Sequence, residues 1–172
     1  MPLYAIGDRV PTIDPTAFVH PDAVLIGAVV VGPESSIWPT AVLRGDSGRV
    51  VVGARTSIQD GSVLHCTSEL DTLVGDRCVV GHRVHLEGCT LEDDTLAGSG
   101  SVILHGAVVR AWGFVAAGAV VAPRTEVPSG AMAMGVPARI RLDAAPRELI
   151  EASVASYVGK THWYNAELRR LG

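Results

Sequence analysis

Residues 96–121 read LAGSGSVILHGAVVRAWGFVAAGAVV, and an aliphatic side chain recurs in them at every sixth position. The same spacing extends over most of the chain. The aliphatic positions are Ile26, Val31, Ile37, Leu43, Val52, Ile58, Leu64, Val74, Val80, Leu86, Leu91, Ala97, Ile103, Val109, Val115 and Val121. Small side chains stand two residues earlier, among them Ser35, Ala41, Thr56, Ser62, Thr72, Cys78, Thr95, Ser101, Ala107 and Ala119. A repeat of this length decides the architecture before any single motif does.

Each six-residue unit predicts one short strand followed by a tight corner. The aliphatic residue points inward, and the small residue fits the crowded corner. Three such strands close a triangular coil of about eighteen residues, which stacks at roughly 4.8 Å on the next coil. A β-sandwich would show alternation with irregular turn spacing instead. We therefore predict an all-β fold, a parallel β-helix whose stacked coils form the core. The spacing leaves the hand of the coil open.

Composition restricts the class of protein. The chain has 172 residues, enough for one domain, with 48% hydrophobic but only 5% aromatic residues. A net charge of −4 argues against a nucleic-acid partner, which would select a basic patch. The cysteine count is odd, at three, and there is no CxxC pair, which predicts a reduced, cytoplasmic protein. The first residues, MPLYAIGDRVPTID, do not resemble a signal peptide, and no apolar stretch is long enough to predict a membrane span.

The repeat also divides the chain. Prolines exclude a helix from residues 1–24, which we interpret as an entry segment. The repeat is interrupted between Leu43 and Val52 and between Leu64 and Val74, where the step is longer than six residues. The extra residues in each step predict a loop at a corner. We assign residues 1–142 to the β-helix with its entry segment. Residues 143–172 show helical spacing, which predicts a helix packed on one face of the β-helix. Gly159 weakens the middle of this segment, so either one helix or two shorter helices would fit.

Spacing brings polar residues together. Leu64 and Leu86 lie on the same face one coil apart, so their successors His65 and Glu87 become outward neighbours about 4.8 Å apart at the backbone. Two such side chains can share a metal ion. Ile58 and Val80 likewise share a face one coil apart, so Asp60 and His82, two residues after each, become neighbours at the end of a different strand. His82 then completes a site with His65 and Glu87 only across a subunit boundary.

Four segments in this order resemble the γ-class carbonic anhydrases: RGD (44–46), IQDGSVLH (58–65), GHRVHLEGC (81–89) and GVPA (135–138). The resemblance extends from residue 14 to residue 157. It implies a left-handed coil and a homotrimer with metal sites between subunits. In that family an Arg and an Asp matching Arg44 and Asp46 form an intersubunit ion pair. A Gln matching Gln59 contacts the metal-bound water, and an Asp matching Asp60 supports the site.

The third metal ligand departs from the family pattern. The resemblance implies ligands at His65, at His82 and five residues after His82, where this chain has Glu87 instead of His. Glu87 then either binds the metal through oxygen, as in two-His, one-Glu zinc sites, or acts as a base or supporting acceptor while His85 binds the metal. In a third interpretation the site is empty. Two imidazoles and a carboxylate suit zinc first, with iron(II) or cobalt as alternatives.

The predicted function is therefore a γ-carbonic-anhydrase-like trimeric metalloenzyme, in which metal-bound water or hydroxide attacks carbon dioxide or a related small electrophile. A carboxylate ligand cancels part of the metal's charge, so the bound water becomes less acidic and carbon dioxide hydration slower at neutral pH. Three alternatives remain: a metal-dependent ester or thioester hydrolase, a non-catalytic metal-binding scaffold, and a hexapeptide acyltransferase.

Three more residues are candidates for the same site. Glu69, in the loop after His65, is a candidate base or proton shuttle. His105 lies one coil above Glu87 and is a candidate for lining the same pocket. Tyr164, on the predicted helix, is a candidate for reaching over the same pocket.

Overall fold

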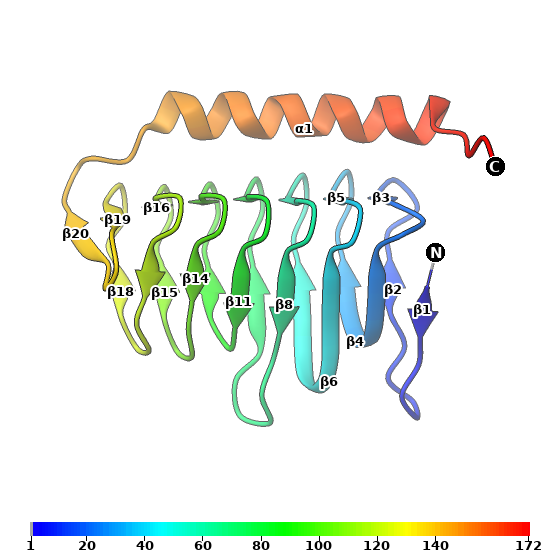
Figure 1. Cartoon of the computed structure of the whole chain (residues 1–172), viewed down its shortest axis with the longest axis horizontal. Coiled ribbons are helices and arrows are strands. Elements are labelled where there is room, and N and C mark those ends of the chain that lie inside the picture. Colours follow the sequence, from blue (N-terminus) through cyan, green and yellow to red (C-terminus); the bar gives the residue numbers. More distant parts are fainter. Residues whose placement is uncertain (1) are drawn as a thin grey trace.

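The computed structural model describes residues 2–172 and consists of a left-handed parallel β-helix with one long helix beside it (Figure 1). The fold predicted from the six-residue spacing is thus confirmed. Coils of short strands stack from the N-terminus at one end to β20 (Arg139–Arg141) at the other. The helix α1 (Arg147–Glu167) returns along the whole stack, so the C-terminus lies near the first coils.

One side of the triangular prism, here called face one, is a sheet of eight strands. All neighbours pair in parallel except β19 and β20, which are antiparallel. Its strands are β3 (Phe18–Val19), β5 (Ser36–Ile37), β7 (Ser57–Ile58), β10 (Val79–Val80), β13 (Leu96–Ala97), β16 (Phe114–Val115), β19 (Met132–Met134) and β20 (Arg139–Arg141).

The other two sides form a single sheet of twelve strands. They are joined because β4 (Val24–Val31) and β6 (Val42–Val52) bend around the corner and belong to both sides. Face two also contains β1 (Leu3–Tyr4), β8 (Val63–His65), β11 (His85–Glu87), β14 (Val102–Ile103) and β17 (Val120–Val121). Face three also contains β2 (Thr12–Ile13), β9 (Thr72–Val74), β12 (Thr90–Leu91), β15 (Val108–Val109) and β18 (Glu126–Val127).

The predicted aliphatic positions fill the prism, with one exception. From Val31 to Val121 each of them is almost completely buried, and so are the small corner residues. The exception is Ile26, because in β4 the fully buried side chain is Leu25. Alternation then turns Ile26 outward, where it pairs with Arg44 of β6. The prediction that Ile26 points inward was wrong by one residue.

The two predicted interruptions take different forms. The first is absorbed within β6, which runs continuously around the corner while its register against β4 shifts between Gly27 and Val29. The prediction of a separate loop there was therefore wrong. The second interruption is a loop of residues 66–71 between β8 and β9, as predicted, and it extends from the lower edge of the prism in Figure 1.

The helix α1 is one continuous piece despite Gly159. Its buried side chains Ile150 and Val154 pack on Val79 and Leu96 of face one. Face one is thereby covered, whereas the polar motifs of the sequence lie on face two and at its two edges. No helix of residues 2–172 has the length and apolarity needed to cross a membrane.

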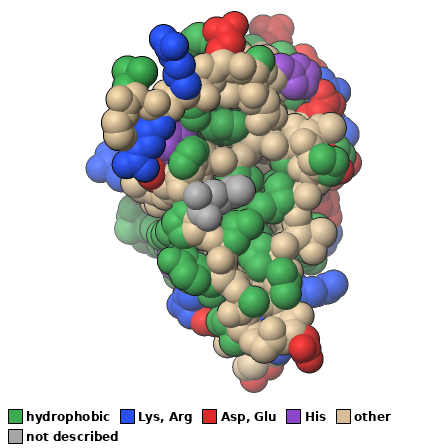
Figure 2. All heavy atoms as spheres, turned by 90° about the vertical axis from the view of Figure 1, so that its right-hand side faces the viewer, with side chains coloured by type: hydrophobic (Ala, Val, Ile, Leu, Met, Phe, Trp, Pro, Cys, Tyr) green, Lys and Arg blue, Asp and Glu red, His purple; other side chains and the backbone are tan. Residues whose placement is uncertain are grey.

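The end of the prism near the N-terminus carries many apolar side chains (Figure 2). Exposed apolar residues of the first segment include Leu3, Tyr4, Ile6 and Val10. The last coil at the opposite end is closed by the antiparallel pair of β19 and β20.

Candidate functional site

A row of polar side chains crosses face two. Arg44, His65 and Glu87 are in register on three adjacent strands, β6, β8 and β11. Leu64 and Leu86 beside them are fully buried, so alternation along the strand turns His65 and Glu87 outward. The structure therefore brings His65 and Glu87 side by side on neighbouring coils, in the arrangement that the spacing predicted.

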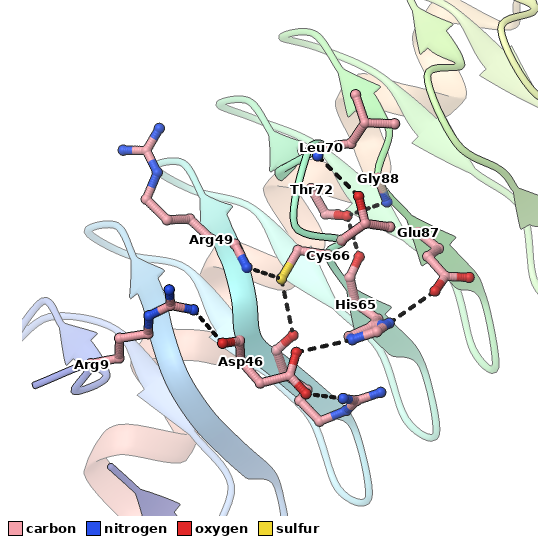
Figure 3. Close-up of polar contacts among 12 residues, drawn as sticks. Arg9, Asp46, Arg49, His65, Cys66, Leu70, Thr72, Glu87 and Gly88 are labelled. Carbon is pink, nitrogen blue, oxygen red and sulfur yellow. Dashed lines mark hydrogen bonds and ion pairs between the residues drawn. The ribbon is translucent and has the colours of Figure 1, made fainter. Parts of the chain in front are cut away.

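The ring of His65 lies between two carboxylates (Figure 3). Its Nδ1 is 2.9 Å from Glu87 Oε1, and its Nε2 is 3.1 Å from Asp46 Oδ1. Asp46 also accepts a hydrogen bond from the Arg44 guanidinium of the same chain, whereas the resemblance implied a pair between subunits. Partial burial alone would raise the pKa of Asp46, but the hydrogen bonds from His65 and Arg44 outweigh it and lower that pKa. A neutral imidazole has only one N–H, so the tautomer decides which of the two carboxylates accepts a hydrogen bond from His65.

Glu87 has imidazoles near both of its oxygens. Oε2 is 3.4 Å from His85 Nε2 and 3.6 Å from His105 Nε2. The hydrogen bond from His65 lowers the pKa of Glu87 most; burial opposes this, and His85 and His105 add to it. Glu87 is therefore ionised at neutral pH and available as an oxygen ligand. Its side chain is only 24% exposed, and that of His65 only 19%.

A second polar group lies at the other edge of face two. Asp60 follows β7 and His82 follows β10, and Asp60 Oδ2 is 3.0 Å from His82 Nδ1. Both side chains are about half exposed, at 46% and 51%. Gln59, one residue before Asp60, is 5% exposed. Since His82 precedes β11 and Glu87 ends it, the strand separates this group from the pair of His65 and Glu87 within one chain.

The helix supplies a tyrosine to the neighbourhood of this second group, but not the one that the sequence suggested. Burial is the main cause that raises the pKa of Tyr157, and the negative charge of Asp60 adds to it. Tyr164, proposed from the sequence as a pocket residue, instead packs between Phe18 and Trp38 on face one, with ring centroids 5.5 and 4.9 Å away. Helical spacing placed both tyrosines on the buried side of α1, but it could not show which of them faces the prism edge.

Glu69 lies in the loop of residues 66–71, and its side chain is exposed. Its backbone N–H donates to Thr67 Oγ1 at 3.3 Å. The loop is fastened at its end by other residues. Arg49 and Asp71 form an ion pair at 2.8 Å, and the Thr72 hydroxyl donates to the backbone carbonyl of His65. These contacts fix the backbone of His65 without bringing Glu69 into the cluster.

The donor atoms for a metal are divided between the two edges. Within residues 2–172, no three His, Cys, Asp or Glu side chains surround one metal position as they stand. His65 and Glu87 offer a nitrogen and an oxygen at one edge of face two, and His82 offers a nitrogen at the other. This combination of two imidazoles and one carboxylate fits zinc. A complete set of three requires two copies of the chain.

Sequence comparisons find relatives over nearly the whole chain. No family model matches it. Gamma carbonic anhydrase 1, a mitochondrial protein of Arabidopsis thaliana, is 42% identical over 173 residues, covering 96% of this chain and 63% of the relative. The chain thus spans less than two thirds of that plant protein. The carnitine operon protein CaiE of Escherichia coli K12 is 43% identical over 149 residues, covering 87% of this chain and 76% of the relative.

Solved structures with the same fold include two similar in length to this chain. A candidate acetyltransferase of Bacillus cereus superposes with a TM-score of 0.92 at 34% identity, covering 95% of this chain and 96% of the other. A hexapeptide transferase family protein of Anaplasma phagocytophilum superposes with a TM-score of 0.90 at 33% identity, covering 95% and 98%.

Proposed function

Because this chain belongs to the hexapeptide-repeat family that includes CaiE and the γ-class carbonic anhydrases, we propose that it is a homotrimeric metalloenzyme acting on carbon dioxide or a related small electrophile. In this proposal His65 and Glu87 of one subunit and His82 of the next bind one divalent ion. The observation that carries the proposal is the division of the donors between two edges of the same face.

The surface between the two edges supports contact with another subunit. The outward residues on either side of His85 are valines, in register from coil to coil: Val24, Val42, Val63, Val102 and Val120. Apolar rows on an exposed face mark interaction surfaces. A neighbouring subunit packed there would bring its His82 edge to the His65 edge of this one.

The residues around His65 prepare it as a ligand. With an ion bound, Asp46 would accept the N–H of Nε2, and Nδ1, on the side of Glu87, would present its lone pair to the ion. A carboxylate behind a metal-binding histidine fixes its tautomer and orientation in this way. Arg44 holds Asp46 in turn, and Gln59 and Asp60 arrive together with His82 of the neighbouring subunit.

The metal when bound would act as a Lewis acid and lower the pKa of a water molecule towards neutrality. Zinc is the first choice, with iron(II) and cobalt next. Glu87 adds a negative charge where the family has an uncharged imidazole, which opposes that acidification. We therefore expect slower carbon dioxide hydration at neutral pH than a three-histidine site would give. We also keep hydrolysis of a small ester or thioester as an alternative activity. A cytoplasmic location stays a prediction from the sequence.

Acyl transfer is the second candidate, favoured by the names of the two solved relatives. It differs from the first candidate in needing an acyl-CoA and not needing a metal. A non-catalytic metal-binding scaffold would show none of these activities, with or without its metal. Carbon dioxide hydration, hydrolysis of an ester and thioester panel, and acetyl transfer from acetyl-CoA, each measured with and without a chelator, separate the three.

A subunit-mixing experiment tests the shared site directly. His65→Ala and His82→Ala should each lose the metal when purified alone. If the two variants are coexpressed, trimers form in which one subunit supplies His65 and Glu87 and its neighbour supplies His82. Random mixing should restore metal to about one site in four. The matched control mixes His65→Ala with Glu87→Ala, which remove ligands from the same edge and should restore nothing. A metal content that stays at zero in the first mixture, with both variants folded, refutes the intersubunit site.

A further inference from the structure

We propose that Arg9, in the entry segment, is a positioning residue for the proposed metal site. It acts through Asp46: it holds the backbone of Asp46, whose carboxylate orients the ring of His65. This inference rests on the proposed function, because His65 is one of the proposed ligands. It ties the entry segment to a site whose other residues come from the stacked coils.

The segment that carries Asp46 lies outside the regular pairing of the sheet. β6 pairs with β4 up to Gly45 and again from Val50, and its pairing with β8 ends at Arg44. Its pairing with β9 begins at Val50. In the described part of the chain, no residue is paired in register with residues 46–49. The position of Asp46 therefore depends on contacts other than the hydrogen-bond ladder between strands.

Three side chains hold this segment instead. Arg9 Nη1 donates to the backbone carbonyl of Asp46 (Figure 3). The far end of the segment is held by Cys66 and Asp71, which accept from the backbone N–H groups of residues 48–49 at 3.1 and 2.7 Å. The Arg9 donor is a charged guanidinium, and charge-assisted hydrogen bonds are stronger than neutral ones. Of the three side chains, Arg9 is the one that binds the backbone of Asp46 itself.

A tight turn aims Arg9 at this segment. The backbone N–H of Ile6 donates to the carbonyl of Arg9 at 3.0 Å, and the N–H of Arg9 donates to the carbonyl of Ile6 at 3.1 Å. Gly7, within the turn, has φ of +55°, which glycine adopts at little cost. Figure 3 shows the Arg9 side chain extending from the entry segment toward Asp46. Because the turn already fixes the backbone of Arg9, less conformational entropy is lost when its guanidinium binds the carbonyl.

Asp46 transmits this constraint to His65. Its Oδ1 is 3.1 Å from His65 Nε2, and its Oδ2 accepts from Arg44. A bound carbonyl limits how far the backbone of Asp46 can shift, so the carboxylate stays opposite the imidazole. The loss of a partner that orients a metal ligand lowers metal affinity by roughly 10–100-fold. Arg9 is one contact further from the ligand than Asp46, so we expect a loss at the lower end of that range.

Two variants of Arg9 test this with two measurements. Arg9→Met keeps an extended side chain without a donor, whereas Arg9→Lys keeps a charged donor. Arg9→Met should bind Zn²⁺ about tenfold more weakly than wild type, and Arg9→Lys should recover most of the loss. In the metal-free proteins, hydrogen–deuterium exchange of the backbone amides of residues 48–49 should be faster in Arg9→Met. Asp8→Asn is the matched control, because it changes an exposed side chain of the same turn and should alter neither measurement.

The two measurements separate the ways in which the inference can fail. Unchanged exchange at residues 48–49 in Arg9→Met would show that Arg9 does not hold the segment. Faster exchange with unchanged Zn²⁺ affinity would refute the link from the segment to His65. A loss of affinity that Arg9→Lys does not recover, or exchange that accelerates in every coil, would make Arg9 a general stabilising residue and refute its positioning role. Wild-type protein that binds no Zn²⁺ would refute the proposed function, and the exchange measurement would still decide whether Arg9 holds the segment.

Discussion

At the scale of single residues, the proposed chemistry depends on one carboxylate. Glu87 Oε1 lies 2.9 Å from His65 Nδ1, and the other carboxylate oxygen lies near two further imidazoles. A histidine at this position would carry no negative charge. It would also leave His85 and His105 without their shared acceptor. Both changes make Glu87 the most informative residue to replace.

Replacing Glu87 with His should convert the intersubunit site to three imidazoles. Because one negative charge is removed beside the ion, the water there should become more acidic. Carbon dioxide hydration at neutral pH should rise, and the lower limb of the pH–rate profile should move to lower pH. Glu87→Gln is the control. It is similar in shape and neutral but binds metal poorly, so both metal content and hydration should fall. Unchanged metal affinity in Glu87→His, with hydration unchanged or lower at every pH, would remove Glu87 from the ligand set.

Sequence reasoning reached part of this site and missed the rest for physical reasons. Strand register follows from the spacing, so the adjacency of His65 and Glu87 could be predicted. The contact of Asp46 with His65 Nε2 depends on how β6 turns its corner, which spacing does not describe. Tyr157 reaches the Asp60 edge through the packing of α1, and no periodicity within the strands carries that information.

At the scale of elements, the corner shared by β4 and β6 requires glycine. Gly27 has φ of +74°, and a Cβ added there would overlap with the carbonyl oxygen of Gly45 in the adjacent coil. Gly45 itself would overlap with Ala28. Because this corner places Asp46 beside His65, the two glycines hold the site in shape as well as the fold.

Gly27→Ala should therefore destabilise the protein more than a positive φ alone would. Gly100→Ala is the matched control, since Gly100 has φ of +69° but open space around its Cβ position. The control should cost about 1–2 kcal/mol for the left-handed conformation. Gly27→Ala should add about 1–3 kcal/mol or more from the overlap. Urea unfolding of both variants measures the difference, and equal losses would show that the corner relaxes freely.

Arg110 fastens three successive coils on the outside of the prism. It donates to Glu92 of the coil before at 2.7 Å and to Glu126 of the coil after at 2.8 Å. The hydrogen bond from Arg110 is the main cause that lowers the pKa of Glu92, and it does the same for Glu126. In the unfolded chain both carboxyls return to their ordinary value, near 4.5.

The lowered pKa values of Glu92 and Glu126 determine how the contribution of these ion pairs to stability changes with pH. Because the folded pKa values lie below the unfolded ones, the ion pairs of Arg110 with Glu92 and Glu126 (the Arg110 clamp) stabilise the fold above about pH 4.5. This stabilisation is lost as the pH falls through the folded pKa values. Arg110→Gln should thus lower the free energy of unfolding at pH 7 and change it little at low pH. Urea unfolding across pH 3–7 measures this difference. The effect should be small and should shrink in high salt, because the groups are exposed. A difference that is constant over the whole range contradicts the clamp.

At the scale of the whole molecule, the fold could be predicted because the same six-residue pattern of aliphatic and small side chains recurs in every coil. Fifteen of the sixteen aliphatic positions taken from the spacing are buried, and only Ile26 is shifted by one residue. Six residues before Val31 is Leu25, which is the buried residue, so the strict spacing gives the inward position and the step of five residues to Ile26 does not. The assembly of subunits could not be predicted in the same way, since outward valines follow the same alternation on faces two and three.

The proposed trimer makes those two faces unequal, and a pair of matched variants tests this. Val63, on face two, is 38% exposed, and Val30, on face three, is 40% exposed. If face two packs against a neighbouring subunit, Val63→Arg buries a charge without a partner and should dissociate the trimer to folded monomers. Val30→Arg should leave the assembly intact. Sedimentation velocity measures the mass and circular dichroism the fold. In the proposed site His82 reaches His65 only across the interface, so monomeric Val63→Arg should also lose the intersubunit metal. A stable trimer in Val63→Arg would place the subunit contact, and with it the shared site, elsewhere, whereas monomers in wild type would refute both the trimer and the shared site.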